Sequence, residues 1–331
     1  MMDRKPATAP THALGWAWRA VRNELLAFRF RYPVESISGA GAKDSLRYHV
    51  YSERLFVDAM EIDGDGVPRQ RSRLFGISYN PAYVAWYGLL ALDEAVRTAD
   101  ATRVGRFLAQ VQWLEREAVV RGDAVVWPYT FDWREGHCDL KAPWISAMAQ
   151  GLAMSVLVRG ARVTGRKELL DLARAATRVF ERGIDEGGVV TRDGHHVLYE
   201  EYPGRPLPRV LDGFLFSLLG LYDVAVETDD VGIWQLFRSG VTGLVAALES
   251  WNYRGKWSWY GSHGYLCPPQ YQALNAALLE GLAGLTGEPR LAWYAQRWKA
   301  VNLSFWDKVE IFTVFLITKN GARLRFGWGR R

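Results

Sequence analysis

The sequence has 331 residues and a formal net charge of +5, with hydrophobic residues at 49% and charged residues at 23%. These values are ordinary for a globular protein made of one large domain or two smaller ones. A modest positive excess favours polyanionic partners. No nucleic-acid-binding motif accompanies the charge, so nucleic acid is not expected as a partner.

The N-terminal part of the chain, residues 1–79, is predicted to hold a helix followed by a short β segment. Charged residues interrupt the apolar stretch of "MMDRKPATAPTHALGWAWRAVRNELL", which is therefore expected to be neither a secretory signal nor a membrane span. Two or three strands are expected around the turn Asp63-Gly64-Asp65-Gly66. We expect this segment to lie across the helical part that follows or to cover its mouth.

Four long apolar segments then begin near Pro81, Trp144, Arg209 and Gln270, about 63 residues apart. Each is apolar nearly all round, as in a helix that is buried on every side. Each is followed by a short polar turn and a second helix with one charged face. The repeated pairs of helices predict a mainly α fold. Because the connection within each pair is short, its two helices should be antiparallel. We expect an (α/α) toroid, or barrel, of about four helical hairpins over residues 80–301.

Three longer links connect one hairpin to the next, and each is rich in Trp and Tyr. Their alternating apolar residues and Gly turns predict β-hairpins or irregular loops. Every link joins an outer helix to the next inner helix, so all of them should emerge at the same rim. Aromatic and carboxylate side chains that are far apart in the sequence are therefore expected to meet at one mouth.

The last segment, residues 302–331, is predicted to be a basic tail with one β-strand. Its apolar run "VEIFTVFLIT" is too short to cross a bilayer, so no transmembrane segment is expected. The basic residues of the tail are Arg323, Arg325, Arg330 and Arg331.

Two composition signals bear on function. The chain has 15 Trp and 15 Tyr, which suits either stacking on sugar rings or a Trp-rich core, and composition does not separate the two. Its two cysteines, Cys138 and Cys267, form no CxxC pair and no His/Cys cluster. Nothing in the sequence therefore calls for a structural zinc site or a disulfide, and no metal or cofactor is expected.

Four short motifs occur in order along the predicted helical part: "SAMAQG" (146–151), "EEYP" (200–203), "GFLFSLLGLYD" (213–223) and "RWK" (297–299). With these motifs the chain resembles the C-terminal helical domain of the D-glucuronyl C5-epimerases. The resemblance runs from about Asn80 to Lys299. It implies an (α/α) toroid and an enzyme that converts D-glucuronate to L-iduronate within heparosan or heparan sulfate, glycosaminoglycans made by polysaccharide biosynthesis. It implies an isomerase that uses no cofactor.

The chemistry of such an inversion can be stated from first principles. A weakly acidic proton beside the uronate carboxylate must be removed, and another must be returned to the opposite face of the ring. This requires two acid/base groups across the ring and donors that hold the charged intermediate. Tyrosine is a weak base unless a neighbouring cation lowers the pKa of its phenol.

The resemblance implies four catalytic residues in this sequence: Glu201 and Tyr202 in "EEYP", Tyr260 in "SWYG" and Tyr271 in "PPQYQAL". We assign Glu201 and Tyr271 as the two acid/base groups, with Tyr202 and Tyr260 binding the uronate. Glu201 and Tyr202 can share a pocket only if the strand ends there, and Pro203-Gly204 favours such an end.

The chain departs from the family pattern around the last two tyrosines. Gly261 and His263 stand where the family has Asp and Arg, and Gln272 and Asn275 stand where it has His. The substrate carboxylate therefore needs another partner. The candidates for substrate binding are His263, Arg205, Arg209, Gln150, Trp127, Tyr129 and Tyr87. For Trp127 and Tyr129, a hairpin core is the alternative to a sugar platform.

Three functions stay open at this point. An epimerase acting on an acidic polysaccharide is the leading prediction. A lyase shares its first step, and a hydrolase would need a second carboxylate beside the scissile bond. A non-catalytic protein that binds acidic glycans is the third. We expect a cytoplasmic protein, free or peripheral to a polysaccharide-assembly complex at the membrane. A homodimer is an open option.

Overall fold

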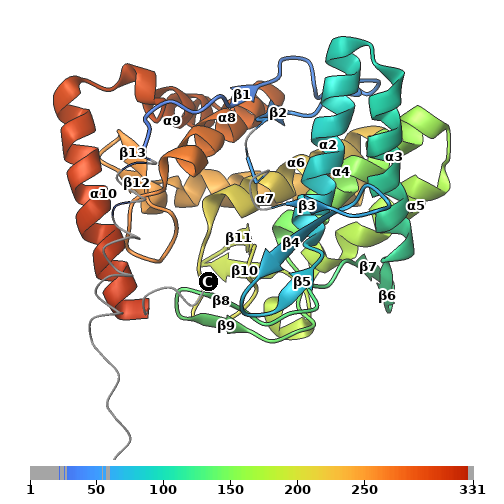
Figure 1. Ribbon diagram of the computed structural model, residues 1–331, viewed down its shortest axis with the longest axis horizontal. Coiled ribbons are helices and arrows are strands. Elements are labelled where there is room, and N and C mark those ends of the chain that lie inside the picture. The colour runs from blue at the N-terminus through green and yellow to red at the C-terminus, as the bar shows by residue number, and fades with distance from the viewer. Residues whose placement is uncertain (1–21, 23–25, 27, 54, 57–59, 327–331) are drawn as a thin grey trace, which may run out of the picture.

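The computed structural model describes residues 22, 26, 28–53, 55–56 and 60–326. The predicted N-terminal helix falls almost wholly outside these described residues, as do Arg330 and Arg331 of the predicted tail. The remaining prediction of a mainly α fold is confirmed: helices dominate, and the sheets are small (Figure 1).

Four helical hairpins form the body of the protein. The first helix of each hairpin buries half or more of its residues: α2 (Pro81–Thr98), α4 (Ala147–Thr164), α6 (Leu211–Thr228) and α8 (Pro269–Thr286). The second helix packs on it and exposes its polar face: α3 (Ala101–Arg116), α5 (Glu168–Ala176), α7 (Val231–Ala247) and α9 (Pro289–Arg297). The buried helices pack side by side in chain order, α2 on α4, α4 on α6 and α6 on α8.

Helices α4 and α6 pack more closely than any other pair among the described elements, because two glycines face each other where they cross. A Cβ on Gly220 would lie 2.2 Å from the carbonyl oxygen of Gly151. A Cβ on Gly151 would in turn lie 2.5 Å from the carbonyl oxygen of Phe216. Any larger residue at either position would force the two backbones apart.

The links between hairpins form the β-hairpins that the sequence predicts. They are β6 (Val119–Arg121) with β7 (Ala124–Val126), β8 (Trp133–Glu135) with β9 (Cys138–Leu140), β10 (Val190–Asp193) with β11 (His196–Tyr199), and β12 (Asn252–Tyr253) with β13 (Trp257–Ser258). All four pairs are antiparallel, and in β10–β11 the register sets Val190 opposite Tyr199.

The N-terminal segment also contains the predicted short strands. They are β1 (Glu35–Ser36) with β2 (Val50–Tyr51), and the three-stranded sheet of β3 (Glu61–Ile62), β4 (Pro68–Ser72) and β5 (Gly76–Ser78). The turn between β3 and β4 is the predicted Asp63–Gly66 turn, where the Asp63 carboxylate accepts the backbone N–H groups of Asp65 and Val67. Strands β1 and β2 pack on α8, and β4 packs on α2.

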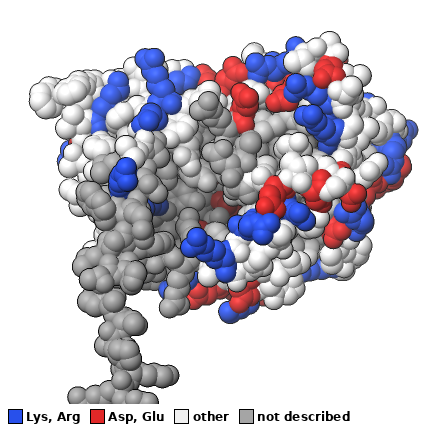
Figure 2. Space-filling view, viewed as in Figure 1, with Lys and Arg blue, Asp and Glu red and all other residues white. Residues whose placement is uncertain are grey.

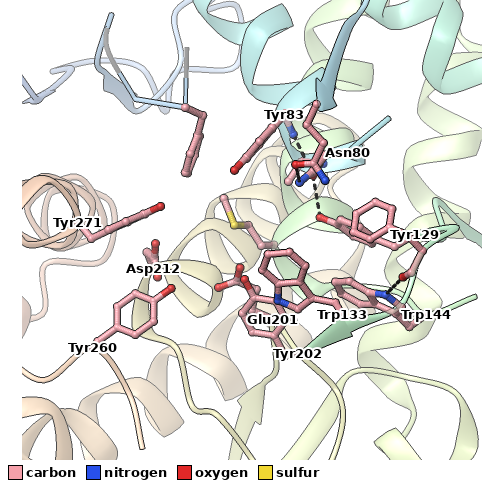
Figure 3. A pocket seen from close by; sticks show the side chains of 15 residues that line it. Asn80, Tyr83, Tyr129, Trp133, Trp144, Glu201, Tyr202, Asp212, Tyr260 and Tyr271 are labelled. Carbon is pink, nitrogen blue, oxygen red and sulfur yellow. Dashed lines mark hydrogen bonds between the residues drawn. The ribbon is translucent and has the colours of Figure 1, made fainter. Parts of the chain in front are cut away.

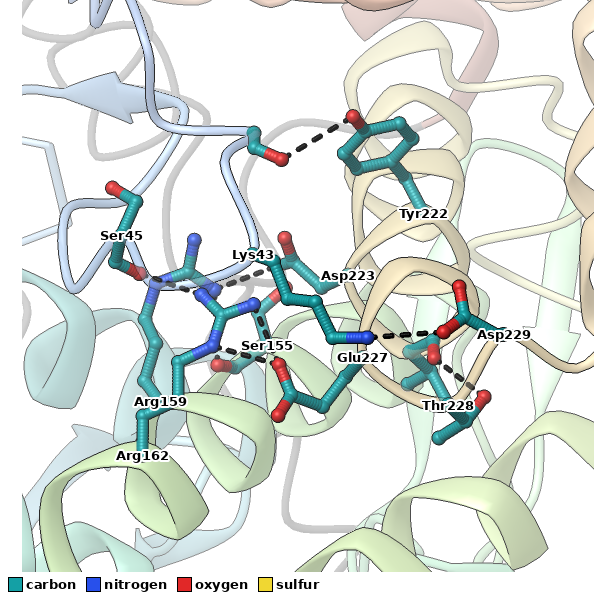
Figure 4. Close-up of polar contacts among 12 residues, drawn as sticks. Lys43, Ser45, Ser155, Arg159, Arg162, Tyr222, Asp223, Glu227, Thr228 and Asp229 are labelled. Atoms are coloured by element: carbon teal, nitrogen blue, oxygen red, sulfur yellow. Dashed lines mark hydrogen bonds and ion pairs between the residues drawn. The ribbon is translucent and has the colours of Figure 1, made fainter.

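A buried ion-pair cluster ties this segment to α4 and α6 (Figure 4). Arg159 of α4 donates to the Asp223 carboxylate of α6 at 2.6 Å and to the Arg47 carbonyl at 2.9 Å. His49 Nε2 lies 2.8 Å from the other Asp223 oxygen. Burial opposes ionisation of Asp223, but the charges of Arg159 and His49 hold its pKa well below the usual value. The cluster therefore joins three segments through charges that water does not reach.

The C-terminal segment corrects one prediction. The expected strand in "VEIFTVFLIT" is part of a helix, α10 (Phe305–Phe326). The helix begins with a reciprocal cap, in which Ser304 Oγ accepts the Asp307 N–H and Asp307 accepts the Ser304 N–H. Ile311, Phe315 and Ala322 recur at helical spacing and are buried, so the run of β-branched and aromatic residues packs as one helix face.

By length and composition alone, the stretch Val231–Trp251 could span a membrane. In the structure it is α7 and the short turn after it, and α7 packs on α6 and β11. Figure 2 shows Lys and Arg interspersed with Asp and Glu over the part of the surface where α2 and α3 lie. The net positive charge is therefore not gathered into one patch there.

Candidate active site

One pocket holds all four predicted catalytic side chains. The space inside the pocket and its open mouth together is about 550 Å³. Its lining comes from all three links, from α2, α4, α6 and α8, and from the N-terminal segment. The lining residues are Phe56, Gln70, Asn80, Ala82, Tyr83, Tyr129, Phe131, Trp133, Trp144, Met148, Glu201, Tyr202, Asp212, Tyr260 and Tyr271. Figure 3 shows Tyr260 and Tyr271 facing Glu201 across the pocket.

The chain turns sharply between Glu200 and Tyr202, and this turn separates two adjacent carboxyl groups. Strand β11 ends at Tyr199, as the strand break predicted from Pro203-Gly204 requires. Glu200 points away from the pocket, where the Thr191 hydroxyl donates to it at 2.5 Å and Arg209 Nη1 lies 3.4 Å away. Glu201 and Tyr202 both enter the pocket.

The start of α6 is shaped to receive Glu201. A Cβ on Gly213 would lie 2.5 Å from Glu201 Oε2 and 2.4 Å from Glu201 Cβ. Only glycine leaves room for that carboxyl group against the first turn of the helix. The neighbouring residue of the same turn, Asp212, also lines the pocket.

Burial changes the protonation of both carboxyl groups. It raises the pKa of Asp212 to about 7. Burial, together with the nearby Asp212 charge, also raises the pKa of Glu201 well above its usual value, although a hydrogen bond with Tyr202 opposes this. The pocket therefore holds neutral carboxylic acids below pH 7, and these can donate hydrogen bonds.

The tyrosines form the opposite wall. Tyr271 lies in the first turn of α8, and its ring centroid is 5.9 Å from that of Tyr260. Burial raises the pKa of both Tyr260 and Tyr202 well above the usual value for a phenol. Phe56 of the N-terminal segment lies between α2 and α8, with its ring 4.9 Å from Tyr83 and 6.1 Å from Tyr271. These phenols supply further donors to a ligand in the pocket.

The predicted sugar platform is only partly present. Tyr129 lines the pocket, stacks on Trp144 at 4.0 Å and donates its hydroxyl to Asn80. Trp127 lies in the core instead, where its indole donates to the Leu114 carbonyl. Tyr87 of α2 does not line the pocket, and Tyr83, one turn nearer the start of that helix, does.

Gln150 and the predicted cations lie outside the pocket lining. The Gln150 amide is fully buried and is bound to the backbone of Trp127 and Val125. Arg205 is exposed and pairs with Asp185. Arg209 lies beside the Glu200 carboxylate, on the side of the turn that faces away from the pocket.

His263 is also buried, with its Nε2 3.0 Å from Glu135 Oε1. Among the described residues that line the pocket, none is Lys, Arg or His. Nor do the described residues contain a group of three His, Cys, Asp or Glu side chains that could hold a metal ion. Both Cys138 and Cys267 are free and buried.

The amino-acid sequence of the chain is similar to those of known proteins. A family model described as "D-glucuronyl C5-epimerase C-terminus" matches residues 121–300. The chain belongs to this family. It is also 31% identical, over 230 residues, to a D-glucuronyl C5-epimerase of Caenorhabditis elegans, an alignment that covers 64% of this chain and 37% of that relative. The chain thus spans little more than a third of the length of that epimerase.

The family match covers the part of the chain that carries Glu201, Tyr202, Asp212, Tyr260 and Tyr271. Asp212 was not among the site residues predicted from this sequence by its resemblance to the D-glucuronyl C5-epimerases. One signal for it was present, since Asp212 is a lone acid in the first turn of a largely apolar helix. The residues contributed from outside the match gave no such signal. These are Phe56, Gln70, Asn80, Ala82 and Tyr83.

Proposed function

We propose that the protein inverts C5 of D-glucuronate residues within an acidic polysaccharide, giving L-iduronate. One observation carries this proposal: Glu201 and the pair Tyr260–Tyr271 face each other across a single pocket (Figure 3). Family membership and the relative's name support the same reaction. The four helical hairpins further support an (α/α) toroid, in which the N-terminal segment and Phe56 bridge α2 and α8.

In the proposed mechanism, the phenol oxygen of Tyr271 is the base that removes the proton from C5. The electron pair of the broken C–H bond moves into the carboxylate and forms an enolate-like dianion. Glu201, protonated in its buried setting, returns a proton to C5 from the opposite face. No atom is gained or lost, so the product is the epimer.

The substrate carboxylate meets neutral donors rather than a cation. Protonated Asp212 and the phenols of Tyr202 and Tyr260 all line the pocket, where they can donate hydrogen bonds to the carboxylate of a uronate bound between Glu201 and Tyr271. Preorganised donors of this kind stabilise developing charge in a pocket that excludes water. They take the role for which an Arg was expected.

Incubation with heparosan or desulfated heparin in heavy water tests the proposal. We expect deuterium at C5 of uronate residues in chains of unchanged length, read by proton NMR and by size-exclusion chromatography. Intact chains without deuterium at C5 would rule out the proposed reaction.

A hydrolase is the second candidate, because Asp212 supplies a second carboxyl group in the pocket of Glu201. The same incubation separates the alternatives. Hydrolysis shortens the chains and creates new reducing ends, whereas a lyase leaves ultraviolet-absorbing unsaturated uronate.

Ionisation of Asp212 should weaken substrate binding at alkaline pH. The neutral form donates to the uronate carboxylate, and the anionic form repels it. With a pKa of about 7, the apparent affinity for the glycan should fall above pH 7, by about tenfold per pH unit. Asp212→Asn keeps a donor that does not ionise, so its affinity should stay level. Titration of glycan binding between pH 6 and about 9 for both proteins measures this, and equal pH dependence would contradict the role given to Asp212.

A further inference from the structure

Helix α10 follows the region that the family model matches, yet it packs against the loop that carries Tyr260. Ile311 and Phe315 form a small buried cluster with Trp257 and Leu266, and Tyr260 packs on this cluster. The hydroxyl of Thr318 also accepts the Leu266 N–H at 3.4 Å. The C-terminal helix is thus part of the support of the candidate active site.

Ion pairs fix the position of α10 along the β12–β13 hairpin. Lys256 Nζ lies 2.5 Å from Asp307 and 2.9 Å from Glu310. Glu310 also accepts from the Tyr253 hydroxyl at 2.9 Å and pairs with Arg254 at 2.8 Å. Three side chains of the hairpin and two of the helix therefore hold the first turns of α10, which determines where its later residues point.

Lys319 lies three turns further along the helix and contacts the aromatic loop. Its Nζ is 3.6 Å from the ring centroid of Tyr265 and 6.0 Å from that of Tyr260. These two rings are stacked, with centroids 5.3 Å apart and planes at 14°. An ammonium group over a desolvated aromatic face is attractive, and it stabilises negative charge on a nearby phenol.

The other groups that face Tyr260 act against its ionisation. Glu135 of β8 and Asp212 of α6 raise the pKa of this phenol by their charge, and Tyr202 and Tyr265 contribute in the same direction. His263 and Tyr271 have ring centroids 5.1 and 5.9 Å away. Lys319 is a cation that lies against these rings, and the Arg325 guanidinium lies beside Gly264 of the same loop.

We propose that Lys319 is a positioning residue for the Tyr260 phenol: it holds the stacked rings and stabilises negative charge on the phenol oxygen, so that Tyr260 donates a stronger hydrogen bond to the uronate. Its importance for catalysis rests on the proposed epimerisation. Its effect on the phenol does not, and the two can be tested separately.

The first test replaces Tyr260 with 3,5-difluorotyrosine, whose phenol ionises at much lower pH, in the full-length chain. The fluorine NMR signal reports the ionisation of this ring alone. In the Lys319→Gln background the fluorophenol pKa should rise by about one unit, the size expected for loss of a charge about 6 Å away. Lys319→Arg should restore most of the parent value. A fluorophenol pKa unchanged by Lys319→Gln would overturn the proposal.

Lys308→Gln is the matched control. It removes the same charge from the same helix, eleven residues earlier and so about 16 Å away along the axis. The fluorophenol pKa should stay at the parent value in this variant. Lys319→Met, which keeps the aliphatic stem, gives the same comparison if Lys319→Gln has a lowered melting temperature. An equal rise in pKa in the Lys308 variant would show a general field effect and refute the specific role.

The second test is the pH profile of deuterium exchange into the glycan, with natural tyrosine at position 260. In Lys319→Gln the alkaline limb, on which ionisation of Tyr260 removes its donor proton, should move to higher pH by the same amount as the fluorophenol. If the parent protein shows no exchange, the proposed function fails while the fluorine titration still decides the role of Lys319. A shifted fluorophenol with an unshifted exchange profile would show that Lys319 acts on the ring but not on the reaction.

Discussion

Glu201→Gln should abolish the formation of L-iduronate while leaving glycan binding nearly unchanged. Burial raises the pKa of Glu201 well above its usual value, so an amide of the same shape replaces a carboxyl group that favours its neutral form. The amide cannot deliver the proton to the opposite face of the ring, and loss of a general acid or base lowers rates by about 10²–10⁴-fold. The yield of L-iduronate by proton NMR and the glycan affinity, measured on the same preparation, check this prediction.

Glu200→Gln is the control for this experiment. The two residues are adjacent, but Glu200 points to Thr191 and Arg209 on the far side of the turn. L-iduronate formation in the Glu200 variant should stay within a few-fold of the parent, with any loss confined to stability. If the two variants lose L-iduronate formation equally, Glu201 acts through the fold and not through its proton. If Glu201→Gln still forms L-iduronate at the parent rate, the acid is another group.

Asp223→Ala should cost about 3–5 kcal/mol in the free energy of unfolding, the range for breaking a buried ion pair from one side. The substitution leaves Arg159, which is fully buried, and His49 without their shared carboxylate. Urea titration followed by circular dichroism measures the change. The prediction applies above pH 4, because the depressed pKa of Asp223 means that its contribution is present above the unfolded-state pKa and is lost only as the pH falls toward the folded-state value.

Lys43→Ala provides the comparison. It breaks an ion pair between the same N-terminal segment and the end of α6, but Lys43 and Asp229 are 59% and 77% exposed. Exposed pairs contribute at most about 1 kcal/mol. Similar losses in the two variants would mean that the buried cluster adds nothing beyond an ordinary surface contact.

The helical hairpins could be predicted because their signal is local. Segments apolar on all sides, each followed by a polar turn, require buried helices, and the observed starts at Pro81, Ala147, Leu211 and Pro269 lie within a few residues of the predicted ones. The strand predicted in residues 302–331 was wrong because Val, Ile, Phe and Thr favour strands when read alone. The segment is a helix because Ser304 and Asp307 cap its start and because Ile311 and Phe315 pack against Trp257.

The candidate site was predictable where a motif carries it. Glu201, Tyr202, Tyr260 and Tyr271 share the pocket as expected, since links of one kind emerge at one rim. Partners set by tertiary contacts were not predictable. Gln150 satisfies backbone groups of a neighbouring hairpin, and His263 faces a buried Glu135, because each lies beside a partner that its own sequence neighbourhood does not show.

The backbone contact between Gly151 and Gly220 has a consequence for how a polymer could enter. Met148, Asp212 and the Glu201 turn all sit near the ends of two helices that touch without intervening side chains. The wall of the pocket formed by the ends of α4 and α6 should therefore move only as a rigid body. Any opening that admits an internal sugar of a long chain must therefore come from the other walls of the pocket, and hydrogen exchange should be slowest at the glycine crossing.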